Sequence, residues 1–148
     1  MSEKARLAGR YFREGYNCCQ SVVLAFAPEA GLDGKTAALL GSSFGGGMGR
    51  LREVCGAVSG MFLVLGLVDG YDSPADIRGK AAQYARVQKL AEKFRGENGS
   101  IVCRELLGLA EHTSGPDPEK RTEAYYQKRP CAELVECAAG LLEKELQK

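Results

Sequence analysis

The chain has 148 residues, of which 45% are hydrophobic, and its 20 basic and 19 acidic side chains give a formal charge of +1. A chain of this length can bury a substantial core, so residues 1–148 are expected to form a single domain. The charges are interspersed and give no indication of a nucleic-acid partner or of an anionic membrane surface. The segment 1–6 lacks the apolar core of a secretory signal, and the uncharged run 54–68 is too short to span a bilayer. We therefore expect a cytoplasmic protein without an integral membrane segment.

Two capped helices are predicted at the beginning of the chain. Ser2 and Asn17 are suitable N-cap residues, and the helices that follow them are expected to reach about Glu14 and Ala27. In the second helix the apolar residues recur every three or four positions, which places Cys19 in the core stripe. A turn and a short helix are expected next, over residues 28–34 and 35–41.

The centre of the chain combines a glycine-rich loop with an uncharged segment. The glycines between residues 45 and 49 permit backbone torsions that other residues avoid, and a buried central helix is expected over about residues 50–68. Gly56 and Gly60 lie on one face of this helix, so another backbone can approach it closely. This face and the uncharged run are also a candidate contact for a homodimer.

The second half of the chain predicts the longest helix, which begins at Ser73-Pro74 and continues to Gly96. Short helices are expected over residues 103–108 and 119–127, and Cys131 opens the last helix. No alternating run is long enough to indicate a strand. The fold class is therefore predicted to be all-α, a single-domain bundle of about six to seven helices around the central helix.

Six cysteines without any Cys-x-x-Cys spacing are the main functional signal. Cys18, Cys103 and Cys131 fall in the first turns of predicted helices, and Cys55 follows the glycine-rich loop. Because free N–H groups at a helix N-terminus stabilise negative charge, these positions are expected to lower the pKa of a thiol. The basic residues nearest to them in sequence are Arg52, Arg104 and Arg129.

Only the folded chain could bring these cysteines together, and their spacing leaves three interpretations open. Four gathered thiolates would suit zinc or an iron–sulfur cluster, whereas two would form a reversible dithiol in which Cys55 pairs with another cysteine. In the third interpretation the cysteines are small buried hydrophobes in a helical interaction module. His112, in a polar loop, is assigned no role.

Several segments, taken together, resemble the C_GCAxxG_C_C family of redox-active proteins over nearly the whole chain. The segments are Asn17-Cys18 with Gln20-Ser21-Val22, Gly45-Gly46-Gly47-Met48-Gly49, Glu53-Val54-Cys55-Gly56-Ala57-Val58-Ser59-Gly60, Cys103-Arg104-Glu105-Leu106-Leu107-Gly108, and Cys131-Ala132-Glu133-Leu134-Val135. The resemblance implies a helical domain whose functional residues are Cys18, Cys55, Cys103 and Cys131. In related domains fused to multihaem cytochromes it implies a cysteine-bound iron–sulfur cluster.

The resemblance therefore implies a redox or electron-transfer protein that binds an iron–sulfur cluster or another thiophilic metal through these four cysteines. A metal-free thiol oxidoreductase or redox sensor, and a helical module tied to a redox or transporter partner protein, are the alternatives. Cys19 and Cys137 lie outside the family pattern, so the ligand set stays open. Nothing in the pattern indicates an enzyme that converts an organic substrate.

Overall fold

The structure is a computed structural model that describes residues 1–110 and 113–147. Every regular element in these residues is an α-helix, so the predicted all-α class is confirmed. The described ranges contain no strand, only an isolated antiparallel bridge between Val54 and Val102. In the same ranges, no helix combines the length and the apolar character needed to cross a bilayer. His112 lies outside the described residues.

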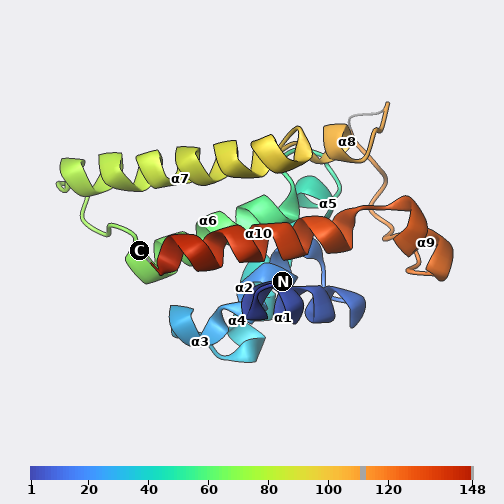
Figure 1. Ribbon diagram of the computed structural model, residues 1–148, viewed down its shortest axis with the longest axis horizontal. Helices are drawn as coiled ribbons and strands as arrows, with labels where there is room; N and C mark the ends of the chain where they lie inside the picture. Colours follow the sequence, from blue (N-terminus) through green and yellow to red (C-terminus); the bar gives the residue numbers. More distant parts are fainter. Residues whose placement is uncertain (111–112, 148) are drawn as a thin grey trace.

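The chain folds as a succession of helices of very different lengths (Figure 1). They are α1 (Glu3–Arg13), α2 (Cys18–Ala25), α3 (Ala27–Ala30), α4 (Gly34–Gly41), α5 (Gly45–Met48), α6 (Gly56–Asp69), α7 (Ile77–Asn98), α8 (Cys103–Leu106), α9 (Glu123–Lys128) and α10 (Cys131–Leu146). Seven of the helices in the described ranges have six residues or more, and α3, α5 and α8 are single turns.

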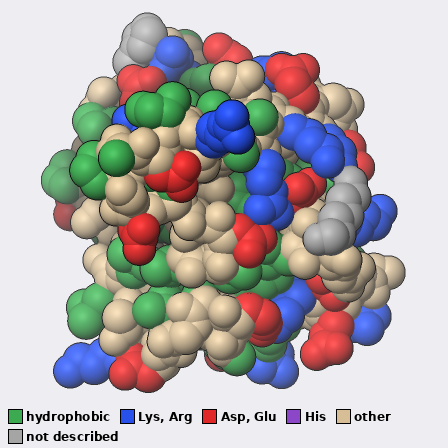
Figure 2. All heavy atoms as spheres, turned by 90° about the vertical axis from the view of Figure 1, so that its left-hand side faces the viewer, with side chains coloured by type: hydrophobic (Ala, Val, Ile, Leu, Met, Phe, Trp, Pro, Cys, Tyr) green, Lys and Arg blue, Asp and Glu red, His purple; other side chains and the backbone are tan. Residues whose placement is uncertain are grey.

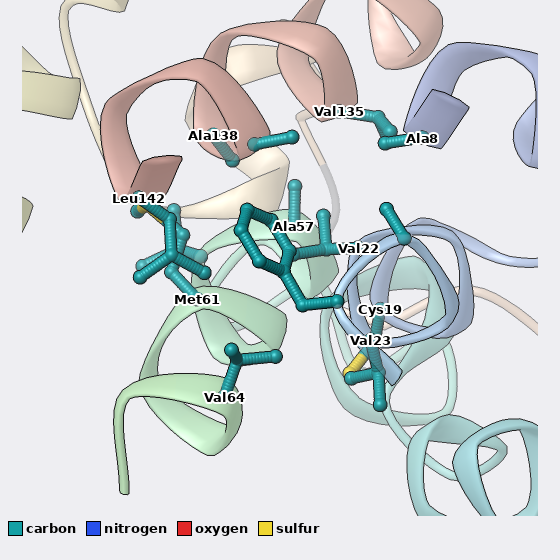
Figure 3. Close-up of a cluster of buried hydrophobic side chains, with 14 of the residues drawn as sticks. Ala8, Cys19, Val22, Val23, Ala57, Met61, Val64, Val135, Ala138 and Leu142 are labelled. Atoms are coloured by element: carbon teal, nitrogen blue, oxygen red, sulfur yellow. The ribbon is translucent and has the colours of Figure 1, made fainter. Parts of the chain in front are cut away.

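The hydrophobic core lies where α1, α2, α6 and α10 pack together (Figure 3). Figure 3 shows Val22 of α2, Met61 of α6 and Leu142 of α10 around one buried region, and all three side chains are fully buried. Cys19 is also fully buried, which confirms its predicted place in the core stripe of α2. The core therefore joins helices from both ends of the chain.

The glycine face of α6 is filled by α2. A β-carbon at Gly56 would lie 2.8 Å from the carbonyl oxygen of Phe44 and 3.1 Å from the Cβ of Cys18. One at Gly60 would lie 2.9 Å from the Cβ of Val22. The expected close approach to this face is thus confirmed, and because the approaching segment is α2 of the same chain, these glycines are not free to contact a second copy.

The central helix begins later than predicted. It starts at Gly56 rather than at about Arg50, because the residues before it do not have right-handed helical torsions. Arg50 and Arg52 have positive φ values of 66° and 61°, which are unfavourable for residues other than glycine. Cys55 has non-helical torsions, with φ −52° and ψ 132°, and precedes the helix as its N-cap. The turn predicted over residues 28–34 also needs correction, because residues 27–30 form the single helical turn α3.

The helix α7 is the longest, as predicted, but the core covers only its second half. Leu90 and Phe94 are fully buried, whereas Ile77 and Tyr84 are 67% and 53% exposed. Arg86 fixes α7 to the rest of the bundle through Asp69 and Glu145, at 2.9 Å and 3.1 Å. Figure 2, which views the molecule from the left-hand side of Figure 1, shows acidic and basic side chains interspersed over this face, as the sequence indicated.

Candidate functional site

One cavity brings together the four cysteines singled out in the sequence. Its volume is about 320 Å³, and Cys18, Cys55, Cys103 and Cys131 all line it. Cys18, Cys103 and Cys131 are the first residues of α2, α8 and α10, and Cys55 is the N-cap of α6. Cys18 and Cys131 are partly exposed, whereas Cys55 and Cys103 are buried. The cavity is at the end of the bundle where α5, α8 and α9 lie (Figure 1).

Local hydrogen bonds fix the position of Cys18. The Asn17 side chain accepts a hydrogen bond from the Gln20 N–H at 2.8 Å, and the Gln20 side chain accepts one from the Asn17 N–H at 3.0 Å. This reciprocal capping box sets the first turn of α2 and therefore the direction of Cys18. The side-chain amide of Asn17 also donates to the carbonyl oxygen of Gly41 at 3.3 Å, which ties α2 to α4.

Backbone hydrogen bonds join the segments that carry Cys55 and Cys103. The Cys55 N–H donates to the carbonyl oxygen of Ile101 at 2.8 Å, and the Cys103 N–H donates to that of Glu53 at 2.6 Å. These bonds flank the bridge between residues 54 and 102. They hold the start of α8 against the start of α6, so two cysteines distant in sequence face the same cavity.

The glycine-rich loop packs directly on Cys103. Gly47 has a φ of 69°, and a β-carbon there would lie 2.6 Å from the Cβ of Cys103 and 2.8 Å from the backbone nitrogen of Glu53. The absence of a side chain at Gly47 therefore lets the loop backbone pack closely on α8.

Burial keeps the thiols of Cys55 and Cys103 protonated at neutral pH. It raises the pKa of Cys55 to about 12, although N–H groups in the first turn of α6 act in the opposite direction. Burial also raises the pKa of Cys103, and the Arg52 guanidinium, which donates to the Cys103 sulfur at 3.6 Å, offsets part of this rise. The prediction that helix N-termini lower these pKa values is wrong here, because the loss of water outweighs the local N–H groups.

Cys131 differs from the other three, because its pKa is lowered to about 7. The largest cause is the hydrogen bond that the Cys18 thiol donates to it; the Tyr125 hydroxyl also donates, and Arg129 and Arg121 contribute positive charge. The same hydrogen bond is the first cause that raises the pKa of Cys18, since it holds the proton on that sulfur. The thiolate form of Cys131 is therefore favoured beside a protonated Cys18.

Of the three arginines nearest to the cysteines in sequence, two lie at the cavity. Arg52 and Arg129 line the cavity. Arg104 does not, because it pairs with Glu53 at 3.3 Å and donates to a backbone carbonyl oxygen. An arginine next to a cysteine in the sequence therefore does not always lie at the cavity that the cysteine lines.

Sequence reasoning missed Tyr125, Arg121 and Arg50, all of which line the cavity. No local signal could have identified these side chains, because Tyr125 lies in the short helix α9 and the two arginines in irregular segments. Only the tertiary fold brings them to the cysteines.

The structure does not contain a preformed metal site among the residues that it describes. Within 1–110 and 113–147, no group of three or more His, Cys, Asp and Glu side chains is arranged to hold a metal ion. The four thiols share a cavity, but no three of them are arranged to hold one metal ion. The remaining cysteines lie elsewhere, Cys19 in the core and Cys137 in a hydrogen bond to Glu97 at 2.8 Å.

A comparison with known families agrees with this set of cysteines. The family model that matches is described as "Putative redox-active protein (C_GCAxxG_C_C)" and covers residues 16–145, which include all four cysteines of the cavity. No curated protein and no solved structure matches the chain. The match extends over most of the chain and confirms the resemblance seen in the sequence. The chain therefore belongs to the C_GCAxxG_C_C family of redox-active proteins.

Proposed function

We propose that the protein is a thiol–disulfide redox protein whose active pair is Cys131 and Cys18. The observation that carries the proposal is that Cys18 and Cys131 open two helices at one accessible cavity, where Cys18 lies close enough to Cys131 to lower its pKa. A thiolate with a pKa near neutrality is an effective nucleophile, and a second thiol beside it can complete a disulfide. The hypothesis that Cys55 is the central partner is less well supported, because its thiol is buried and stays protonated.

The chemistry assigns a separate step to each cysteine. The Cys131 thiolate attacks one sulfur of a disulfide, the sulfur–sulfur bond breaks, and one half leaves as a thiolate. Cys18 then gives its proton to the leaving thiolate and attacks the Cys131 sulfur, which releases the second half and forms a Cys18–Cys131 disulfide. The substrate gains an electron pair and the protein loses one. A dithiol protein, the redox partner expected in the cytoplasm, would reduce the pair again.

Mild oxidation tests the pairing. We expect the wild-type protein to lose two of its six thiols, and peptide mapping to identify one disulfide, between Cys18 and Cys131. Cys18→Ser and Cys131→Ser should each prevent its formation. Cys137→Ser is the matched control, because Cys137 lies outside the cavity, and it should leave disulfide formation unchanged. An unchanged thiol count in the wild type, or a disulfide between other cysteines, would overturn the proposal.

An iron–sulfur cluster bound by Cys18, Cys55, Cys103 and Cys131 is the second candidate function. It is favoured by the presence of all four cysteines at one cavity, where the negative charge of a thiolate raises the pKa of its neighbours. A bound cluster would supply electron transfer. The side chains would first have to turn toward a common centre, since they are not arranged to hold a metal ion in the described structure.

Anaerobic purification separates the two functions. Stoichiometric iron and acid-labile sulfide that are lost in Cys55→Ser would establish the cluster, because Cys55 is not a member of the proposed thiol pair. Protein that carries neither element and still forms the Cys18–Cys131 disulfide would establish the dithiol. Visible absorption of the purified protein gives the same distinction before any chemical assay.

A further inference from the structure

The cavity that holds the cysteines is strongly basic, although the whole chain has a formal charge of only +1. Its basic side chains are Arg50, Arg52, Arg121 and Arg129. Among the described residues, the only acidic side chain on its wall is Glu119, which pairs with Arg129 at 3.1 Å. The cavity therefore has an excess of positive charge around its thiols.

Arg50 and Arg52 are fixed in place by an unusual backbone. Both have positive φ, and the glycines at 46, 47 and 49 share this left-handed conformation. The Arg50 Nε donates to the carbonyl oxygen of Gly115 at 2.6 Å, and the Arg52 Nε donates to the Ser114 hydroxyl at 2.9 Å. Unfavourable torsions at two arginines that line one cavity are typical of a site where side-chain direction matters more than backbone stability.

Arg121, which also lines the cavity, is held in a comparable way. Its Nη2 donates to the carbonyl oxygen of Tyr16 at 2.7 Å, and its guanidinium lies 3.8 Å from the ring centroid of Phe12. A guanidinium carries several N–H donors, and these contacts use only some of them. The cavity thus combines held cations with hydrogen-bond donors that are left for a ligand.

Not all of the arginines at the cavity serve to stabilise the Cys131 thiolate. Arg129 and Arg121 act on Cys131, and Arg52 acts mainly on Cys103. Arg50 is not among the principal causes of the pKa shifts of Cys131 and Cys103, although it lines the same cavity. A cation in this position is suited to a charged group on the molecule that reacts with the thiols.

We propose that the cavity binds a low-molecular-mass disulfide that bears carboxylate groups, and that Arg50 and Arg52 pair with these carboxylates. This inference rests on the proposed function, because the disulfide is the oxidant that Cys131 attacks. Guanidinium and carboxylate groups form paired hydrogen bonds. A volume of about 320 Å³ is at the small end of the range for ligand pockets, which favours a compact molecule.

The reaction with such a disulfide is balanced within the cavity. Cys131 forms a mixed disulfide with one half of the ligand and expels the other half as a carboxylate-bearing thiolate. Cys18 donates a proton to that thiolate and displaces the first half, so one disulfide is reduced to two thiols while the Cys18–Cys131 disulfide forms. The positive cavity stabilises the negative charge on both the bound and the leaving half.

Two disulfides of similar length test the inference. 3,3′-Dithiodipropionate carries two carboxylates, whereas bis(2-hydroxyethyl) disulfide is neutral. We measure the rate at which each disulfide oxidises the reduced full-length protein and divide the rate with dithiodipropionate by the rate with the neutral disulfide. The same ratio is measured for dithiothreitol, which serves as the reference thiol. The ratio for the protein is expected to exceed that of the reference by roughly fivefold or more, and to fall with added salt.

Arg50→Gln should lower this ratio roughly threefold. Arg78→Gln in α7 removes the same charge outside the cavity and should leave the ratio unchanged. If neither disulfide produces a Cys18–Cys131 bond, the proposed function itself fails. The neutral disulfide could instead produce this bond while the rate ratio of the protein equals that of dithiothreitol, or while Arg50→Gln leaves the ratio unchanged. Either result would overturn only the proposal that the substrate is anionic.

Discussion

Alkylation of Cys131 by iodoacetamide is expected to reach half of its maximal rate near pH 7, where its pKa lies. The thiolate is the reactive form, so a lowered pKa keeps Cys131 reactive down to neutral pH and the reactivity is lost as the pH falls through this value. Cys18→Ala removes the largest cause of the lowered pKa and should raise the midpoint by about one to two pH units. The rate at pH 6 would then fall roughly ten- to hundredfold. Mass spectrometry of the Cys131 peptide between pH 5 and 10 measures both midpoints.

Two comparisons make this result specific. Cys137 is an internal control, because burial and Glu97 raise its pKa to about 11 and it should react slowly in the same samples. Tyr125→Phe should raise the Cys131 midpoint less than Cys18→Ala does, since the tyrosine hydrogen bond is the smaller cause. A wild-type midpoint at the ordinary value of 9.0, or one that Cys18→Ala leaves in place, would contradict the assignment of Cys131 as nucleophile.

The parts of the fold that depend on local chemistry could be predicted from the sequence. Ser2 and Asn17 cap α1 and α2 by accepting hydrogen bonds from N–H groups three residues further on, and a contact of this range is visible in the sequence itself. The start of α10 at Cys131 was also predictable from a local signal, the proline directly before it. Local signals therefore placed three of the four cysteines at helix starts.

The start of the central helix could not be predicted, because it depends on a distant segment. The uncharged run from Val54 onward resembles a continuous helix, but Val54 pairs with Val102 instead and leaves the helical path. The glycine-rich loop suggested unusual torsions, yet nothing in the sequence shows that Arg50 and Arg52 share them. A contact between segments so far apart overrides the local helical preference.

The sequence predicted the direction of the pKa shift correctly for only one of the four cysteines at the cavity, Cys131. Position at a helix N-terminus is a local property, whereas burial depends on the whole fold, and burial dominates at Cys55 and Cys103. Cys131 owes its low pKa to Cys18 and Tyr125, which approach it from other helices. The family resemblance identified the cysteines, and the structure shows which two of them are coupled most directly.

The glycine-rich loop links the stability of the fold to the geometry of the site. Met48, Arg50 and Arg52 adopt positive φ without being glycines, at a cost of about 1–2 kcal/mol each. The loop keeps this conformation through backbone hydrogen bonds, among them those from the N–H groups of Arg52 and Glu53 to the carbonyl oxygens of Gly46 and Gly47. Contacts of the loop with α8 must offset the cost, and these contacts also position Cys103.

Gly47→Ala is therefore expected to lower the free energy of unfolding by about 3 kcal/mol or more. The new β-carbon would lie 2.6 Å from the Cβ of Cys103 and 2.8 Å from the backbone nitrogen of Glu53, in addition to a φ of 69°. Gly49→Ala is the matched control: its φ is 60°, but its nearest neighbour is the Ser43 carbonyl oxygen at 3.7 Å, so only the torsional cost of about 1–2 kcal/mol applies. Urea unfolding of both variants measures the difference, and equal losses would show that the packing of the loop on Cys103 does not stabilise the site.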